Sequence, residues 1–277
     1  MSGSRTTAIL LHGLCSTPEE LMPVQATLRG AGHGVLPMRI AGYSFDAGRT
    51  EQQARPYGQW IAAVAEQAKA LHAEGRRVVI VGISAGATLA LAAAMRAPAA
   101  VDGLVLMSIP LVYDGWAIPK RHVLMPLALY TPLGRLWQYR EQPPYGVKNV
   151  RVRAWIEREL ATRRVSCAGA AVIGVPHLRE HDRLRRKVRR RLADFDCPPV
   201  LALHAVEDEV ASPSNVTLLQ NRLRTPSFRA VLLPDSHHMI TIDNDRQQVA
   251  SETLAFVAAI DAPSQALAER DAAALTP

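Results

Sequence analysis

A serine stands between two glycines near the middle of the chain, in the run Gly82-Ile83-Ser84-Ala85-Gly86. The β-branched residues 78–81 before it predict a buried strand, and the Ala- and Leu-rich residues 88–95 after it predict a helix. Glycines two positions on either side of the serine allow neighbouring backbones to approach closely in a sharp turn. Such a turn presents the serine hydroxyl at a helix N-terminus, where an oxyanion is favoured. Ser84 is therefore the candidate nucleophile.

A serine hydroxyl is a poor nucleophile until an imidazole takes its proton, so one of the nine histidines must lie beside Ser84. Catalytic groups of a parallel sheet lie at the carboxyl ends of its strands. His237 and His238 follow the last predicted strand, residues 228–233, and meet that condition. We therefore expect the base in this doublet.

A carboxylate should orient the imidazole, and the order serine, acid, histidine places it before the doublet. Glu207, Asp208 and Glu209 follow the predicted strand 199–205. We expect Asp208 to accept the hydrogen bond from the imidazole and the two glutamates to be solvated.

The oxyanion formed on attack needs fixed N–H donors. The residue after the nucleophile supplies one of them, the backbone N–H of Ala85. The second is expected from the loop His12-Gly13-Leu14, which follows the first predicted strand, residues 7–11. Leu14 would donate its backbone N–H.

The chain has 277 residues, of which 48% are hydrophobic and 21% charged, so it is long enough for one large globular domain with an insertion. No apolar stretch is long enough to cross a bilayer, and no secretory segment precedes the first predicted strand, so we expect a cytoplasmic location. Cys15, Cys167 and Cys197 lack Cys-x-x-Cys spacing, which indicates neither a disulfide framework nor a metal site.

The net charge of +7 is concentrated in one predicted helix, Arg179 to Arg191, which holds eight Lys or Arg residues. Three interpretations compete, and we favour the first: a solvated face, a weak contact with an anionic membrane or carrier phosphate, and a nucleic-acid patch. No aromatic residue is interleaved with these arginines, so the stacking surface of a nucleic-acid site is missing and no nucleic-acid partner is expected.

Strands and helices alternate along residues 1–110 and 195–277, which predicts an α/β fold with a mostly parallel central sheet flanked by helices. Residues 111–194 break this pattern. They are too long for one loop, are rich in proline and show helical patterns without convincing buried strands. We therefore expect an α/β core formed by two segments, residues 1–110 and 195–277, and a mainly helical cap, or lid, formed by residues 111–194.

Four segments carry a resemblance to a known family: LLHGLCSTPEEL, GISAGATLAL, HAVEDEVASPSN and PDSHHMITID. In this order and spacing they resemble the α/β-hydrolase superfamily, in particular the small bacterial carboxylesterases related to monoacylglycerol lipases. The likeness covers about residues 7–110 and 195–262. It implies an α/β-hydrolase fold and a Ser-His-Asp triad in which His238 is the catalytic histidine, His237 stands where a glycine is usual, and Asp208 is the acid.

The residues and the resemblance together predict a serine hydrolase that cleaves carboxylic esters with short to medium acyl chains, or monoacylglycerol-like esters, through an acyl-enzyme. This chemistry requires no metal and no organic cofactor. Candidate pocket residues are His237, Trp116 and Trp137, although the tryptophans could instead form the core of the cap. A thioesterase or acyltransferase that uses a CoA- or carrier-linked acyl group is the alternative enzyme, and a non-catalytic binding protein of the same fold is the alternative from another class.

Overall fold

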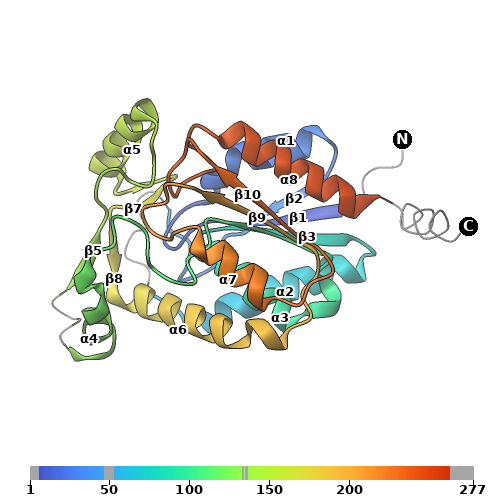
Figure 1. Cartoon of the computed structure of the whole chain (residues 1–277), viewed down its shortest axis with the longest axis horizontal. Helices are drawn as coiled ribbons and strands as arrows, with labels where there is room; N and C mark the ends of the chain where they lie inside the picture. Colours follow the sequence, from blue (N-terminus) through green and yellow to red (C-terminus); the bar gives the residue numbers. More distant parts are fainter. Residues whose placement is uncertain (1–5, 47–52, 133, 135–136, 263–277) are drawn as a thin grey trace, which may run out of the picture.

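The centre of the molecule is a six-stranded sheet in the order β10-β9-β4-β3-β1-β2, and every neighbouring pair is parallel (Figure 1). The computed structural model describes residues 6–46, 53–132, 134 and 137–262. Its central strands are β1 (Thr6–Leu11), β2 (Gly34–Pro37), β3 (Arg77–Ile83), β4 (Gly103–Met107), β9 (Val200–Ala205) and β10 (Phe228–Leu233). The predicted α/β-hydrolase arrangement around a mostly parallel sheet is confirmed.

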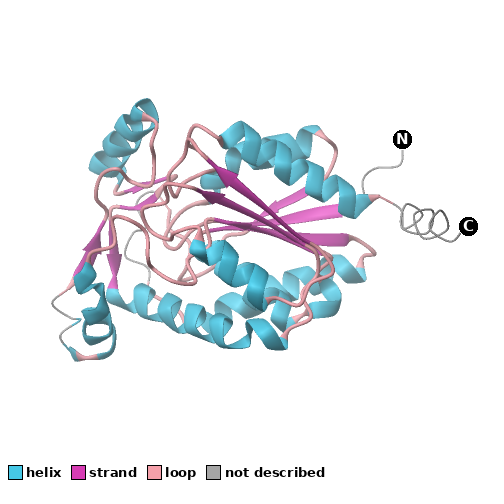
Figure 2. Ribbon diagram, viewed as in Figure 1, coloured by secondary structure: helices cyan, strands magenta, loops and turns pink. Residues whose placement is uncertain are grey.

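Helices cover both faces of this sheet (Figure 2). The α-helices of the described residues are α1 (Met22–Gly30), α2 (Tyr57–Ala73), α3 (Ala85–Arg96), α4 (Met125–Tyr130), α5 (Val150–Arg163), α6 (Val175–Arg191), α7 (Ser214–Arg222) and α8 (Arg246–Asp261), and all except α4 and α5 pack on the sheet. Short 3-10 helices span Pro18–Leu21, Pro98–Ala100, Lys120–Leu124 and Leu192–Asp194. Apolar side chains of α1 and α8 pack on one face, and those of α2, α3, α6 and α7 pack on the other. No helix of the described residues is long and apolar enough to cross a membrane.

Strand β3 shows why its sequence is a continuous apolar run rather than an alternating one. Val78 and Ile80 point into the cluster that contains α2 and α3, whereas Val79 and Val81 point into the cluster that contains α1 and α8. Because side chains alternate between the two faces of a strand and both faces are covered here, each position must be apolar. The predicted buried strand at residues 78–81 is confirmed.

The segment between β4 and α6 lies beyond the carboxyl end of the sheet, with α4 and α5 farthest from it (Figure 1). It contains two antiparallel strand pairs: β5 (Gln138–Arg140) with β8 (Val172–Gly174), and β6 (Val165–Ser166) with β7 (Gly169–Ala170). These strands were not predicted, because two or three residues are too few to show a period of two.

The second half of α6 differs from the prediction that residues 111–194 form a cap. Leu184 and Val188 of α6, and Leu192 directly after it, are buried in the same apolar cluster as Ile80 of β3 and Leu89 of α3. Their spacing of four residues places them on one helix face, which packs against the core. This half of the helix therefore belongs to the layer that supports the sheet.

The basic residues of α6 divide into two groups. Arg179 donates to the backbone oxygen of Leu129, and Arg185 donates to that of Leu111 at 2.7 Å and to Asp182 at 2.6 Å. The second group is exposed, in agreement with the favoured interpretation of a solvated face. Its members are Arg183, Arg186, Lys187, Arg189, Arg190 and Arg191.

Asp243 joins the cap to the loop that carries the histidine doublet. Its side chain is fully buried and accepts hydrogen bonds from the backbone N–H groups of Lys148 at 2.7 Å, Asn149 at 2.8 Å and His237 at 2.9 Å. Each of these donors would be unpaired if the carboxylate were removed. Asp243 therefore fixes the position of the start of α5 relative to the histidine loop.

We predict that Asp243→Ala lowers the free energy of unfolding by about 3 kcal/mol, because it leaves buried N–H donors without an acceptor. Asp243→Asn should cost less, since one acceptor oxygen remains. Chemical denaturation measures this change, and limited trypsin digestion should show faster cleavage near Lys148. The control is Asp235→Ala, whose side chain is 60% exposed. An equal loss in both alanine variants would contradict the role of Asp243.

Candidate active site

Ser84 occupies a strained turn between β3 and α3. Its backbone angles are φ 53° and ψ −122°, a region that non-glycine residues rarely adopt, and its N–H donates to the oxygen of Met107 at 2.8 Å. A Cβ at Gly86 would lie 2.2 Å from the backbone oxygen of Leu11, and one at Gly82 would lie 2.3 Å from that of Gly86. The predicted close approach of backbones at both glycines is confirmed, and it holds the serine side chain at the carboxyl edge of the sheet.

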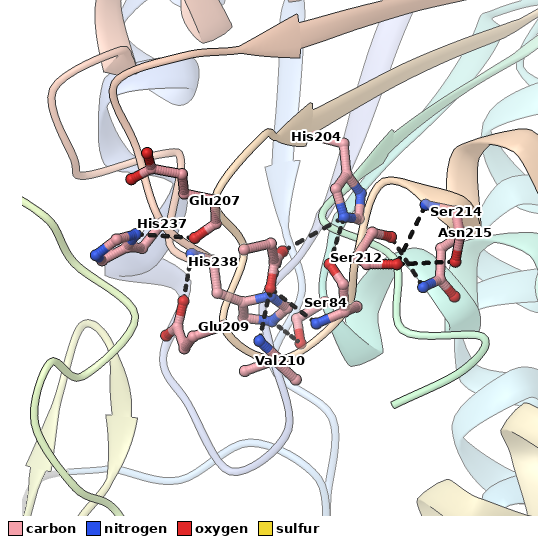
Figure 3. A network of polar contacts seen from close by, with 12 residues as sticks. Ser84, His204, Glu207, Glu209, Val210, Ser212, Ser214, Asn215, His237 and His238 are labelled. Atoms are coloured by element: carbon pink, nitrogen blue, oxygen red, sulfur yellow. Dashed lines mark hydrogen bonds and ion pairs between the residues drawn. The ribbon is translucent and has the colours of Figure 1, made fainter. Parts of the chain in front are cut away.

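The hydroxyl of Ser84 meets the second histidine of the doublet (Figure 3). His238 Nε2 lies 2.8 Å from Ser84 Oγ, and His238 Nδ1 lies 2.8 Å and 3.0 Å from the two carboxylate oxygens of Asp208. With the proton on Nδ1 held by Asp208, the neutral imidazole leaves Nε2 free to accept the serine proton. The structure thus brings together the three residues predicted as nucleophile, base and acid.

The acid loop is held by its own backbone. Asp208 Oδ1 accepts hydrogen bonds from the N–H groups of Val210 and Ala211, each at 2.8 Å, and His204 Nε2 lies 3.5 Å from Asp208 Oδ2. Burial alone would raise the pKa of Asp208, but the imidazole of His238 and these donors hold it below its usual value. The carboxylate is therefore kept ionised and oriented toward His238.

The two neighbouring glutamates differ from one another. Glu207 has an exposed carboxylate that pairs with Lys148 at 3.0 Å, as expected for a solvated residue. Glu209 is buried, and its Oε2 accepts the backbone N–H of His238 at 3.0 Å. The expectation that Glu209 is solvated was wrong, because the turn that presents Asp208 points the next side chain back toward the histidine loop.

The two expected oxyanion donors lie on the same cavity as the serine. Leu14 and Ala85 both line it together with Ser84 and His238. Ala85 is the first residue of α3, so its N–H has no partner within the helix. The loop that carries Leu14 is held by Gly13, whose N–H donates to Glu20 Oε2 at 2.9 Å.

A cavity of about 200 Å³ opens over Ser84 between the core and the cap. Trp137 lines it, as expected, and so do Met125, Ile118 and Ile173 from the cap. The expectation that Trp116 and His237 line the pocket was wrong. Both bond outward to the backbone oxygen of Glu207, Trp116 Nε1 at 3.0 Å and His237 Nδ1 at 2.9 Å, and their rings pack edge to face.

Carboxylates surround the imidazole of His238. Burial disfavours the charged ring, but Asp208, with Glu209 and Glu20, raises the pKa of His238 to about 9. Burial also raises the pKa of Glu20 and that of Glu141 to about 7. Both of these side chains line the cavity. His238 is thus held in an acidic environment.

Sequence reasoning missed Glu20, Glu141 and Glu209 as cavity residues. Glu20 belongs to the segment TPEEL after the oxyanion loop, and Glu141 follows β5 in the cap. A buried carboxylate has no sequence pattern of its own, since a glutamate in a loop is usually solvated. The only available signal was the position of Glu20 and Glu209 next to recognised motifs.

Comparison with known proteins identifies the family of the chain. The sequence model of the alpha/beta hydrolase family matches residues 8–252. The chain therefore belongs to the alpha/beta hydrolase family. It is 24% identical over 254 residues to the thermostable monoacylglycerol lipase of Bacillus sp. (strain H-257), a match that covers 90% of this chain and 89% of that protein. The predicted resemblance to hydrolases of the lipase and esterase kind is confirmed.

Solved structures share the fold at lower sequence identity. A structure from a study of LipS and LipT, two metagenome-derived lipolytic enzymes, has a TM-score of 0.73 and 20% identity, covering 92% of this chain and 94% of that one. A soluble variant of the Saccharomyces cerevisiae monoglyceride lipase in complex with a substrate analog has a TM-score of 0.76 and 12% identity, covering 95% of this chain and 89% of that one.

We predict that Gly86→Ala destabilises the protein by about 2 kcal/mol or more, because its methyl group has no room beside the Leu11 oxygen. Thermal or chemical denaturation measures the loss. Gly58→Ala in α2 is the matched control, since no atom lies within 4 Å of a Cβ there, and it should leave stability unchanged or slightly raised. Equal stability of the two variants would show that the turn is not closely packed.

Proposed function

We propose that the chain is a serine hydrolase that cleaves carboxylic esters with short to medium acyl chains, or monoacylglycerol-like esters, through a Ser84-His238-Asp208 triad. The observation that carries this proposal is the pair of contacts on the two nitrogens of His238, with Ser84 on Nε2 and Asp208 on Nδ1. The Bacillus relative, a monoacylglycerol lipase, supports the substrate class. A cytoplasmic location remains a prediction.

The reaction begins when Ser84 Oγ attacks the ester carbonyl carbon and His238 Nε2 takes the hydroxyl proton. The carbonyl π electrons move onto oxygen, and the N–H groups of Leu14 and Ala85 stabilise the resulting oxyanion. As the tetrahedral adduct collapses, the bond to the alcohol oxygen breaks, and His238 donates its proton to that oxygen. Water then attacks the acyl-enzyme with His238 as base, which releases the acid and restores Ser84.

We place the functional cap at residues 111–174 rather than at the full 111–194. Cap residues Trp137 and Met125 line the cavity, whereas the second half of α6 packs against the core. The cap would enclose the acyl or alcohol group and exclude water from the oxyanion.

A thioesterase or acyltransferase on a CoA- or carrier-linked acyl group would use the same three residues. The exposed arginines of α6 are the feature that could hold the carrier phosphate, but the cavity near Ser84 is lined by carboxylates. Electrostatics at the reaction centre therefore favour the ester substrate over a polyanionic one. A weak contact of α6 with an anionic membrane stays a prediction about that surface alone.

Hydrolysis of p-nitrophenyl butyrate by wild type and Ser84→Ala tests the proposed function. We expect kcat/KM to fall by about 10⁴-fold or more in the variant, since removing a triad nucleophile removes covalent catalysis. Circular dichroism should show an unchanged fold. Comparable rates in the two proteins would refute the nucleophile, and absence of hydrolysis in the wild type across a panel of esters would refute the esterase.

The pH profile should report the acidic environment of His238. Because only the neutral imidazole can act as base, and its pKa is raised to about 9, we predict that kcat/KM for a neutral ester rises with pH until about 9. The titratable groups that interact with the ring are Asp208, Glu209, Glu20, Glu141 and His204, and burial favours the neutral form of His204.

Removing one of these negative charges should lower the pKa of His238. Glu209→Gln removes a negative charge but keeps an acceptor for the backbone N–H of His238. We therefore expect the rise of kcat/KM with pH to shift to lower pH in this variant. Glu207→Gln, which changes an exposed carboxylate, should leave the rise at the same pH. An apparent pKa at or below about 6.5 for the rise of kcat/KM in the wild type, or no shift of that pKa in Glu209→Gln, would contradict this account of the site.

A further inference from the structure

The cavity over Ser84 is lined by acidic rather than basic side chains, although the chain as a whole is basic. The protein carries a net charge of +7, yet none of the described residues that line the cavity is Lys or Arg. Four carboxylic side chains line it instead: Glu20, Glu141, Asp182 and Glu209. Asp182 is neutralised by Arg185 and Arg186 at 2.6 and 2.7 Å, whereas no Lys or Arg side chain of the described residues pairs with the other three acids, and His238 is the cationic group with which they interact.

Glu20 is the most constrained of the three. It is 1% exposed, its Oε2 accepts the Gly13 N–H, and its Oε1 makes no direct hydrogen bond among the described residues, although the nearby Ser16 hydroxyl lowers the pKa of this carboxyl. A buried carboxylate oxygen without a partner is costly, because it has lost its water and gained nothing in return. Because Oε1 itself is closed off from the cavity surface, Glu20 would act on a ligand in the cavity through its charge rather than through a direct contact.

The remaining walls fit the same kind of ligand. Four aromatic side chains line the cavity: Tyr113, Trp137, Tyr139 and Tyr145. The electron-rich faces of aromatic rings attract cations, especially alkylammonium groups that are weakly hydrated. Glu141 lies close enough to interact electrostatically with Glu209, with His238 and with Tyr145. Carboxylates and aromatic rings therefore line the same cavity.

We propose that the chain selects esters that carry a positively charged nitrogen a few bonds from the scissile carbonyl, with Glu141 and Glu20 as the groups that attract it. This inference rests on the proposed ester hydrolysis and names its substrate class. The charge must be near the reacting bond, because Glu20, Glu141 and Glu209 all interact electrostatically with the same imidazole, that of His238. The nitrogen could belong to the alcohol or to the acyl group.

Pairs of substrates that differ only in charge test the proposal. Butyrylcholine is compared with 3,3-dimethylbutyl butyrate, in which carbon replaces the quaternary nitrogen of the alcohol. Ethyl 4-(trimethylammonio)butyrate is compared with ethyl 5,5-dimethylhexanoate, which does the same for the acyl group. We expect kcat/KM to be at least about tenfold higher for the cationic member of one pair, and that pair identifies the side that carries the charge.

Variants then assign the preference to the cavity acids. Glu141→Gln and Glu20→Gln should each reduce the cationic-to-neutral ratio by about threefold or more, while Glu207→Gln, with its exposed carboxylate on the same loop as Glu209, should not change it. Because the ratio compares two substrates on one protein, a general loss of activity in Glu20→Gln does not affect it. Glu141 lies in the cap, so its variant carries the test if Glu20→Gln does not fold.

Three results would overturn the proposal: a ratio near or below one for both pairs, a high ratio that neither cavity variant changes, or a clear preference for glyceryl monobutyrate over both cationic esters. The last would mean that the carboxylates accept hydrogen bonds from hydroxyl groups. A failure of the esterase itself would appear separately, as no hydrolysis of the neutral esters.

Binding gives a readout that needs no turnover. Choline, titrated calorimetrically into Ser84→Ala, should bind at least about fivefold more tightly than into Ser84→Ala/Glu141→Gln. Absence of choline binding, together with no preference for the cationic acyl ester, would also overturn the proposal.

Discussion

The hydrogen bond between Ser84 and His238 joins two loops that lie 154 residues apart in the sequence. Neither loop could hold its side chain in place alone. Ser84 is fixed by a strained turn that packs against β1, and His238 is fixed by Asp208, by Glu209 and by the histidine loop that Asp243 ties to the cap. A parallel sheet brings these loops together because the carboxyl ends of its strands meet at one edge. The sheet, its covering helices and the cap therefore converge on one contact.

The acids around His238 give this site its particular character. A triad needs one carboxylate, whereas this cavity adds Glu20, Glu141 and Glu209. Each favours the charged imidazole that forms as Ser84 attacks, but each also lowers the fraction of His238 that is neutral and able to act as a base below about pH 9. Two of them have further structural functions, since Glu20 holds the oxyanion loop through Gly13 and Glu209 holds the backbone of His238. Their arrangement links the geometry of the triad to the class of substrate that the cavity would accept.

Much of the fold was predictable because local and global preferences agree. Residues 78–81 had to be a strand buried on both faces, and the turn after them had to be tight, so Ser84 could be located without a structure. Asp208 and His238 were located by their position after successive strands, and the resemblance to α/β-hydrolases decided between the two histidines. These predictions depend on periodicity and strand order, which are visible in the sequence.

Other features could not be predicted because they depend on contacts between distant segments. The arginines of α6 concealed the apolar stripe of Leu184, Val188 and Leu192, so the helix was assigned to the cap. The side chains of Trp116 and His237 do not line the cavity, because both form a hydrogen bond with the backbone oxygen of Glu207. The burial of Glu209 results from the path of the acid loop.

Reaction with a fluorophosphonate probe tests the central claim most directly, since only an activated serine attacks phosphorus at a useful rate. Intact-protein mass and peptide mapping would be compared for wild type, Ser84→Ala and Asp208→Asn. We predict one adduct per chain on Ser84 in the wild type, none in Ser84→Ala and much slower labelling in Asp208→Asn, because the imidazole loses its orienting carboxylate. An adduct on another residue, or wild-type labelling as slow as that of Asp208→Asn, would contradict the assignment of Ser84, His238 and Asp208 to one catalytic unit.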